Sequence, residues 1–334
     1  MFGTETGPGI VASNACRLCQ ANLIGGIAVS ATPVDAQGPP PSQEVSGSWV
    51  ERKMKYLFLL PSVSYLLLIG IFPLIFSLYL VFSSWQGGSG ITFVGLDNIR
   101  RLSVDKRFWD SVIRTLIYVA LTAGFQLVFG LLIALSLQFI TRGKAALRLA
   151  LALPILLPPI AISFAWKMLF DFNRGPVNYF LEAAGLPPAT WLAGQKLALF
   201  SLVIVDVWQW TPFVALATLA ALESLPTEIY EAAVVDGGGV WTVLRDITMP
   251  LLMPYLVAIV LLRAIDAFKA FDTVYVLTGG GPGTATELLS FYAYAAGFRT
   301  FNMGFTATVA WATAILMTIV FLFYLRAFRR LEEQ

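Results

Sequence analysis

The chain contains no histidine and only two cysteines in 334 residues. It therefore lacks the most common metal ligand of proteins and their most common general acid or base. Cys16 and Cys19 form a single CxxC pair in the N-terminal tail. Neither a second pair nor a histidine is present to complete a tetrahedral zinc site. We therefore expect no metal site and interpret the cysteine pair as incidental.

Charged residues are also scarce. They make up 13% of the chain, whereas soluble domains carry about 25%. The net charge is only +2, so the sequence lacks the concentrated basic surface that a nucleic-acid partner requires. Apolar residues reach 57%, and the mean hydropathy is +0.75. This balance predicts an integral membrane protein rather than a soluble domain with a large core.

Long apolar segments begin only after residue 50. Residues 1–50 are rich in glycine, serine, proline and other small residues, which predicts a flexible N-terminal tail. Residues 51–334 contain six segments long enough to cross the hydrocarbon layer, which takes about 20 helical residues. They run approximately over 56–82, 112–139, 147–170, 198–222, 249–273 and 304–326. We predict an all-α, polytopic membrane protein with six transmembrane helices.

The distribution of lysine and arginine indicates the orientation in the membrane. An even number of spans places both termini on the same side. That side would hold 11 Lys and Arg residues, and the opposite side 8. Because positive charge is retained on the cytoplasmic side, this excess favours cytoplasmic termini.

A short acidic segment separates the fourth and fifth spans, within the loop 223–248. From Glu231 it reads EAAVVDGGGVWTVLRDITMP. Thr227 is expected to cap a helix there, and Glu228 lies in its first turn, where the helix dipole favours an anion. Gly237, Gly238 and Gly239 are expected to end this helix.

A second helix is expected after the glycines. Trp241, Leu244 and Ile247 recur every third residue, which suits a helix lying against the other spans. The resulting helix–turn–helix fits two roles: a surface connection between spans, or a docking element for a soluble partner. The residues by themselves leave both roles open.

The spacing of the loop resembles a family motif. Its elements are Glu231-Ala232-Ala233, Asp236-Gly237 and Ile247-x-x-Pro250. This pattern resembles the EAA loop of bacterial ABC importer permeases, with Gly238 in place of a usual alanine and Met249 in place of a usual leucine. LTGGGP (277–282), WQWTPF (208–213) and LALPILLPP (151–159) extend the resemblance to residues 55–330. Together they are similar to the carbohydrate branch, in particular the larger membrane subunit of maltose importers.

The resemblance implies a type I importer permease of the bacterial cytoplasmic membrane. It implies four other components: a second, related permease forming a heterodimer, two ATPase subunits and an extracytoplasmic binding protein. The residues implied to couple ATPase closure to the pore are Glu231, Ala232, Ala233, Asp236 and Gly237. The chain itself has no GxxxxGK[ST] motif, because GGGPGT lacks the phosphate-binding lysine. We expect no catalytic residue and no cofactor here, with ATP and Mg²⁺ bound by the ATPase.

Several charged residues lie inside the apolar segments. The fourth span contains Asp206, and the fifth contains Arg263, Asp266 and Lys269, with Asp272 near its end. An ionisable group at the bilayer centre costs at least about 2.5–3.5 kcal/mol, so such groups face a protein interior or a wet cavity. On a continuous helix, residues three apart step around the axis by about 60°. The four residues of the fifth span would then wind around it, either as a salt-bridge ladder or, for some members, along a translocation path.

The resemblance also implies a sugar site midway across the membrane. The matching motifs place Asp206, Gln209, Trp210, Phe213, Arg263 and Asp266 at substrate-binding positions. They place Ile155, Pro159 and Ala267 at positions whose side chains cannot hydrogen-bond, while Lys269 is a further candidate and Trp208 is expected to pack.

We therefore expect a permease subunit that translocates a sugar or sugar-like solute delivered by a binding protein. The same architecture could carry glycerol phosphate, a polyamine or another small solute. A self-contained secondary transporter is the other alternative, although the inverted repeats common in such carriers are not evident.

Overall fold

The computed structural model describes residues 49–140 and 142–332. The expected tail, with Cys16 and Cys19, lies outside the described residues except for its last two positions. The chain divides into two units, Met1–Val63 and Ser64–Gln334. The described part of the first unit is helical and belongs to α1 (Trp49–Leu66).

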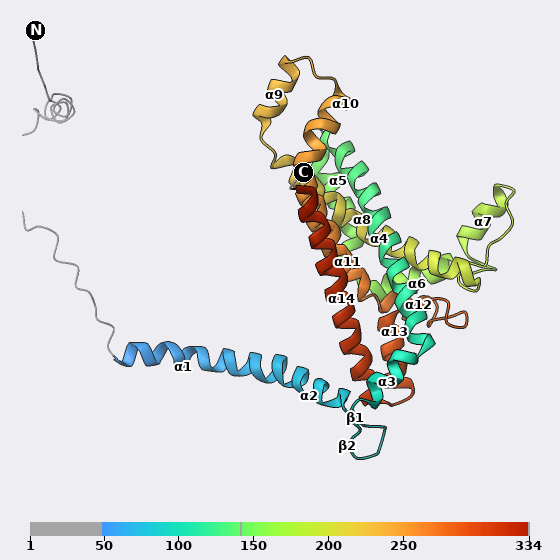
Figure 1. Ribbon diagram of the computed structural model, residues 1–334. Helices are drawn as coiled ribbons and strands as arrows, with labels where there is room; N and C mark the ends of the chain where they lie inside the picture. The colour runs from blue at the N-terminus through green and yellow to red at the C-terminus, as the bar shows by residue number, and fades with distance from the viewer. Residues whose placement is uncertain (1–48, 141, 333–334) are drawn as a thin grey trace, which may run out of the picture. The chain divides into compact units, whose positions relative to one another are not determined.

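Long helices form most of the described chain (Figure 1). The candidate spans are Tyr56–Val81, Lys106–Gln138, Gln195–Glu223, Val240–Phe268 and Met303–Arg326. The elements within them are α1, η1 (Leu67–Ile71), α2 (Phe72–Val81), α4 (Lys106–Gln138), α8 (Gln195–Glu223), α10 (Val240–Thr242), η2 (Val243–Thr248), α11 (Met249–Phe268) and α14 (Met303–Glu332). A bent pair of helices supplies a sixth span, which confirms the prediction of an all-α membrane protein.

Short elements connect these spans. They are β1 (Ser83–Ser84), β2 (Thr92–Phe93), α3 (Asp97–Val104), α7 (Pro176–Ala183), α9 (Thr227–Val235), α12 (Asp272–Leu277), α13 (Leu289–Tyr294) and η3 (Ala295–Arg299). Strands β1 and β2 form one small antiparallel hairpin. Within the second unit, α9, α10 and the end of α14 lie at one end, and α3 with the start of α14 lies at the other (Figure 1).

The third span is broken rather than continuous. Helix α5 (Lys144–Leu156) and helix α6 (Pro159–Leu169) meet at an angle of 92°. The two residues before α6 are extended, with ψ of 139° at Leu157 and 135° at Pro158. A residue that precedes proline is pushed out of the helical region, and proline itself removes a backbone donor. The prediction of one helix over 147–170 is therefore wrong.

The helix of the fifth span ends earlier than expected. Helix α11 ends at Phe268, and α12 begins at Asp272, so the predicted end at residue 273 is wrong. The amides of Lys269 and Ala270 donate to carbonyls three residues back, those of Asp266 and Ala267. This tightened final turn closes the helix before the chain changes direction.

Helices α4 and α8 pack closely at Gly130. A Cβ placed on Gly130 would lie 2.6 Å from Val214 Cγ1 and 3.1 Å from the amide nitrogen of Ala215. Small residues let membrane helices approach until their backbones nearly touch. Gly124, on the same helix, has no atom within 4 Å of such a Cβ.

We expect Gly130→Ala to destabilise the protein by about 1–3 kcal/mol, because the added methyl group overpacks this contact. Gly124→Ala is the matched control, and we expect it to be neutral or to stabilise by about 0.5–1 kcal/mol, because alanine is the better helix former. Thermal unfolding in detergent, followed by tryptophan fluorescence, measures both. Equal unfolding temperatures for the two variants would show that the α4–α8 contact is not tight at Gly130.

Candidate functional site

A polar cavity of about 350 Å³ lies among the long helices of the second unit. Helices α4, α6, α8 and α11 contribute to its wall, together with the residues that join α11 to α12. Its lining residues are Tyr118, Pro159, Asp206, Gln209, Trp210, Arg263, Asp266, Ala267, Lys269, Ala270, Phe271, Asp272 and Thr273. We refer to it as the polar cavity.

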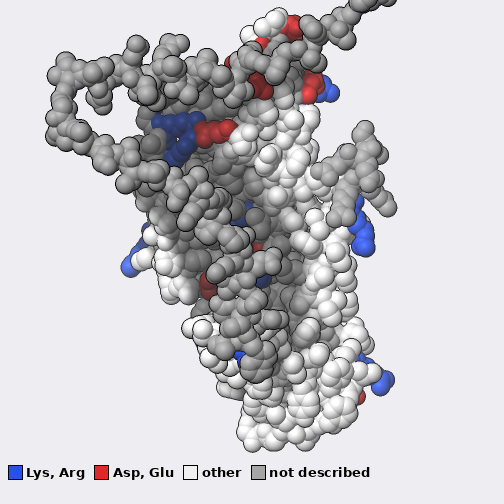
Figure 2. Space-filling view, turned by 90° about the vertical axis from the view of Figure 1, so that its left-hand side faces the viewer, with Lys and Arg blue, Asp and Glu red and all other residues white. Residues whose placement is uncertain are grey.

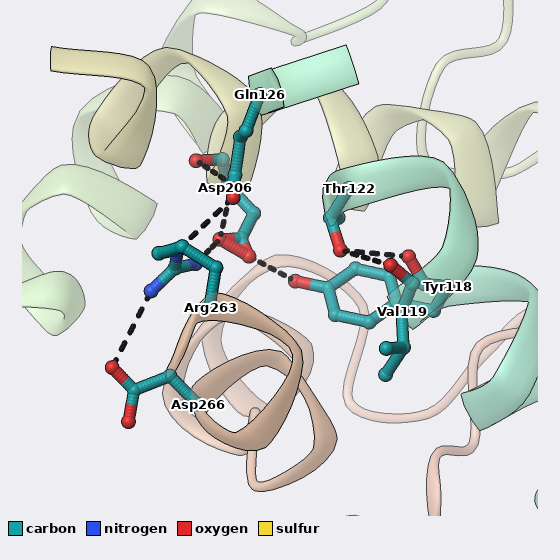
Figure 3. A network of polar contacts seen from close by, with 7 residues as sticks. All are labelled: Tyr118, Val119, Thr122, Gln126, Asp206, Arg263 and Asp266. Atoms are coloured by element: carbon teal, nitrogen blue, oxygen red, sulfur yellow. Dashed lines mark hydrogen bonds and ion pairs between the residues drawn. The ribbon is translucent and has the colours of Figure 1, made fainter. Parts of the chain in front are cut away.

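Asp206 lies at the centre of a buried hydrogen-bond network (Figure 3). Its Oδ1 accepts from Arg263 Nη2 at 3.0 Å and from Gln126 Nε2 at 3.3 Å. Its Oδ2 accepts from the Tyr118 hydroxyl at 3.0 Å. Arg263 Nε donates to Gln126 Oε1 at 3.0 Å. Asp206 is 6% exposed and Arg263 2%, so this ion pair is fully desolvated and depends on its neutral neighbours to complete its hydrogen bonds.

Arg263 joins this network to the open part of the cavity. Its Nη1 lies 3.4 Å from Asp266 Oδ2, and Lys269 Nζ lies 3.2 Å from Asp266 Oδ1. The side chains of Asp266 and Lys269 are 53% and 61% exposed. The guanidinium carbon of Arg263 also lies 4.5 Å from the centroid of the Trp210 ring, within cation–π range.

The break after α11 gathers all four charged residues of this segment on one cavity. On a continuous helix Arg263, Asp266, Lys269 and Asp272 would wind around the axis. Because α11 stops at Phe268 and Asp272 begins α12, all four border the polar cavity. Arg263, Asp266 and Lys269 form the salt-bridge ladder, and the same three residues belong to the polar cavity wall.

Five of the six predicted substrate-binding residues line this cavity, namely Asp206, Gln209, Trp210, Arg263 and Asp266. Phe213 does not line it; its ring packs edge-on against Trp210 at a centroid distance of 6.5 Å. The further candidates Pro159, Ala267 and Lys269 are lining residues, whereas Ile155 is not.

Trp208 packs elsewhere, as expected. Its ring lies 5.8 Å from that of Trp166, and both border an apolar groove of about 700 Å³ between α4, α5, α6 and α8. Trp208 therefore lies at the apolar groove, whereas Trp210, two residues later, lines the polar cavity.

Tyr118 and Gln126 are members of the site that sequence reasoning missed. They belong to a polar stripe on α4 that also contains Thr115 and Thr122, and all four side chains are fully buried. Steps of three, four and four residues place them on one helix face. This stripe in an otherwise apolar span was the signal that could have identified a polar interior.

Both broken spans meet at the cavity. Gln209 Nε2 donates to the carbonyl of Leu157, in the break between α5 and α6, at 3.4 Å. Lys167 Nζ on α6 donates to the carbonyl of Val276 on α12 at 2.9 Å. Irregular backbone at membrane depth is tolerated only where protein buries it or where it lines a wet cavity. The two breaks therefore mark this cavity as the polar interior of the bundle.

Helix α9 is the first helix of the acidic loop predicted from sequence. None of its residues is buried, and the Tyr230 hydroxyl donates to Thr248 Oγ1 at 3.2 Å, which fastens α9 to η2. The amide of Gly238 donates to the Ala233 carbonyl, and Gly237 has φ of 77°, so glycines end the helix as expected. The cap prediction is wrong, because Pro226 precedes the first turn and Thr227 is its first helical residue.

The outer surface of this loop is both acidic and apolar. Figure 2 shows acidic side chains at the end of the molecule where α9 lies. Among the described residues, Glu231 and Asp236 are exposed and belong to no ion pair, whereas Glu223, at the start of the loop, pairs with Lys144 and Arg148. Val235 is 86% exposed and Trp241 is 71% exposed.

The second helix of the loop is partly as predicted. Leu244 and Ile247 are half-buried, but Trp241 is exposed, so the expectation that all three lie against the other spans is wrong for Trp241. A π-helical segment, η2, lies between Trp241 and α11. A π-helical turn contains more residues than an α-helical turn, so residues spaced three apart do not stay on one buried face.

Comparison with known proteins identifies relatives of this arrangement. The profile of the family described as binding-protein-dependent transport system inner membrane component matches residues 104–333. The trehalose/maltose transport system permease protein MalF of Thermococcus litoralis is 35% identical, over 76% of this chain and 85% of that protein. The diacetylchitobiose uptake system permease protein DasB of Streptomyces coelicolor is 33% identical, over 83% of this chain and 87% of that protein.

A solved structure shares the fold. It is a chain of a bacterial ABC transporter involved in the import of the acidic polysaccharide alginate, with a TM-score of 0.73 and 21% sequence identity. The match covers 84% of this chain and 96% of that one.

Proposed function

We propose that this chain carries a sugar or sugar-like solute, on the premise that it belongs to the family of binding-protein-dependent transport system inner membrane components. Members of this family are permease subunits of ABC importers, and ATP hydrolysis lies in a separate subunit. The chain is therefore a multi-pass inner-membrane transport component and not an enzyme. The proposal concerns its solute and the roles of its residues.

The polar cavity is the observation that carries the proposed solute. It combines carboxylate and amide side chains, from Asp266 and Gln209, with the indole of Trp210. Sugar hydroxyl groups need such polar partners, and sugar rings stack on aromatic faces. The relatives named for trehalose/maltose and diacetylchitobiose transport support the same class of solute.

The charges around the cavity disfavour an anionic solute. Asp206, Asp266 and Asp272 oppose Arg263 and Lys269, so three carboxylates against two cations leave one net negative charge. A phosphate-bearing solute would add further negative charge to a cavity inside the bundle, where repulsion between charges is screened less than in bulk water. Glycerol phosphate is therefore less favoured than a neutral sugar, whereas the net charge does not oppose a cationic polyamine, and uptake assays decide among the three.

Trp210 provides a direct test of the cavity. We expect Trp210→Ala to lower sugar uptake by about tenfold or more. The substitution removes an aromatic surface that is worth about 0.5–1 kcal/mol for each group that packs on it. It also removes the ring on which the Arg263 guanidinium stacks. Trp208→Ala removes the same side chain from the apolar groove, and we expect less than a twofold change. The measurement is ATP-driven uptake of labelled disaccharide into proteoliposomes. If the two variants lose uptake equally, the cavity is not the sugar path.

The acidic loop supports the proposed coupling role. Helix α9 has no buried residue, and the same loop exposes the apolar side chains of Val235 and Trp241. A loop that only connected two spans would not need this mixture of charge and exposed apolar surface. We propose that Glu231, Ala232, Ala233, Asp236 and Gly237 contact the ATPase, which makes this end of the molecule cytoplasmic.

The orientation and the partners follow from the same proposal. The end of α14 lies at the same end of the second unit as α9 (Figure 1), which supports a cytoplasmic C-terminus and, with six spans, a cytoplasmic N-terminus. A second, related permease would complete the pore as a heterodimer. An extracytoplasmic binding protein would deliver the solute at the opposite end.

A panel of solutes tests the proposal as a whole. The reconstituted importer is supplied with its binding protein, ATP and, in turn, a neutral disaccharide, glycerol phosphate and a polyamine. We expect saturable uptake of the disaccharide and none of the other two. Uptake of glycerol phosphate or of the polyamine in preference to every sugar would reject the proposed cargo.

A further inference from the structure

A second polar cavity is lined in part by α3, which lies at the end of the second unit opposite α9 (Figure 1). Its volume is about 220 Å³, and it forms where α3 meets the starts of α4 and α14 and the residues of η3. Three of its lining residues are arginines: Arg101, Arg107 and Arg299. We refer to this cavity as the arginine pocket.

Arg107 is already neutralised. Its Nε and Nη2 donate to the two carboxylate oxygens of Glu287, each at 2.7 Å, and Glu287 is 1% exposed. Asp105, the acidic residue of the lining, is also fully engaged. Its Oδ1 accepts from the amides of Arg107 and Phe108 at the start of α4, and its Oδ2 accepts from the Tyr292 hydroxyl at 2.7 Å. Burial and Asp105 raise the pKa of Tyr292, so its hydroxyl remains the donor.

Arg101 and Arg299 are held in place without an acidic partner. The guanidinium carbon of Arg101 lies 4.6 Å from the centroid of the Phe305 ring, and that of Arg299 lies 5.0 Å from that of Phe291. Neither arginine makes an ion pair within residues 49–140 and 142–332. Stacking on an aromatic face fixes the guanidinium plane and leaves its N–H groups free in that plane.

The pocket therefore carries a positive charge that favours binding of an anion. Three arginines against the carboxylates of Asp105 and Glu287 leave one net positive charge. Arg101 on α3 and Arg299 on η3 both lie outside the candidate spans, so their free edges face the aqueous side. A planar carboxylate matches the fork of a guanidinium, with two parallel hydrogen bonds.

We propose that the arginine pocket is a docking site for a carboxylate side chain of the extracytoplasmic binding protein. This inference rests on the proposed orientation, which places the end opposite α9 outside the cell. A chain of this family depends on a binding protein, and the pocket is a concave, positively charged site on the face that such a protein would approach. Charge complementarity of this kind speeds association and fixes the register of the two proteins.

The test compares two neighbouring arginines of α3. Both are exposed, but Arg101 lines the pocket and Arg100 does not. The importer is reconstituted in nanodiscs, with and without anionic lipid, and its affinity is measured for the binding protein that stimulates wild-type ATP hydrolysis. We expect Arg101→Gln with Arg299→Gln to weaken binding about tenfold at low salt and to flatten its salt dependence. Arg100→Gln, which removes one positive charge where the double variant removes two, should change the affinity less than twofold.

A chemical readout identifies the partner group. In Arg101→Lys, a carbodiimide should join position 101 to a carboxylate of the binding protein, and Arg100→Lys should give no such product. Binding by the double variant that equals binding by Arg100→Gln would overturn the inference. So would an effect confined to anionic nanodiscs, because the pocket would then hold a lipid headgroup. An error in the proposed cargo would not affect this test, because binding of the wild-type importer is measured whichever solute it carries.

Discussion

Glu231→Lys is expected to abolish ATP-driven uptake while leaving the membrane fold intact. Glu231 lies on α9, which has no buried residue, so its replacement disturbs no internal packing. If α9 inserts between charged groups of an ATPase, reversing the charge replaces an attraction by a repulsion. Breaking a buried charge pair at a protein interface weakens the affinity by about thirtyfold or more. Uptake and ATPase copurification measure the two consequences of the same substitution.

Asp246→Lys is the matched control for Glu231→Lys. It reverses the same charge on an exposed residue at the same end of the molecule, but on η2 instead of α9. We expect it to retain most of the uptake. If the Glu231 variant still copurifies with its ATPase and transports normally, the docking role of this residue is wrong.

Arg263→Met is expected to destabilise the protein strongly. Arg263 is 2% exposed and pairs with Asp206, which would remain as a buried carboxylate without its cation. Removing one partner of a buried ion pair costs about 3–5 kcal/mol. Lys269→Met is the control, because Lys269 is mostly exposed and its pair with Asp266 lies in the open part of the cavity. We expect it to cost less than about 1 kcal/mol.

A double substitution separates charge from packing. In Arg263→Met with Asp206→Asn no unpaired charge remains, so the double variant should recover part of the stability lost by Arg263→Met. Thermal unfolding of the purified permease in detergent gives all three values. Equal unfolding temperatures for Arg263→Met and Lys269→Met would mean that the buried network contributes nothing to stability.

The sequence predicts the spans well because each requires about 20 apolar residues, which few other structures use. It also contains the break of the third span, since Pro158 and Pro159 stand where a helix cannot continue. The break after α11 is different. The residues Lys269, Ala270 and Phe271 include neither proline nor glycine, so no local signal ends the helix there. That break depends on tertiary contacts, such as the packing of Phe271 against Phe291.

The candidate site was predictable in part for a related reason. Asp206, Arg263 and Asp266 stand out because a charge in an apolar span is costly. Tyr118 and Gln126 do not carry that cost, and only their spacing with Thr115 and Thr122 marks them as one buried face. Phe213 differs from the other predicted residues, because a motif gives sequence position but not the direction of a ring. Its ring packs on Trp210 and does not reach the cavity.

Measuring uptake with an inactive ATPase tests the central claim most directly. Proteoliposomes contain the complete importer, with either the normal ATPase or one whose phosphate-binding lysine is replaced, and receive the liganded binding protein and ATP. A permease that depends on a separate ATPase should take up labelled disaccharide only with the normal ATPase. Continued uptake with the disabled ATPase would contradict the account and would indicate a self-contained transporter.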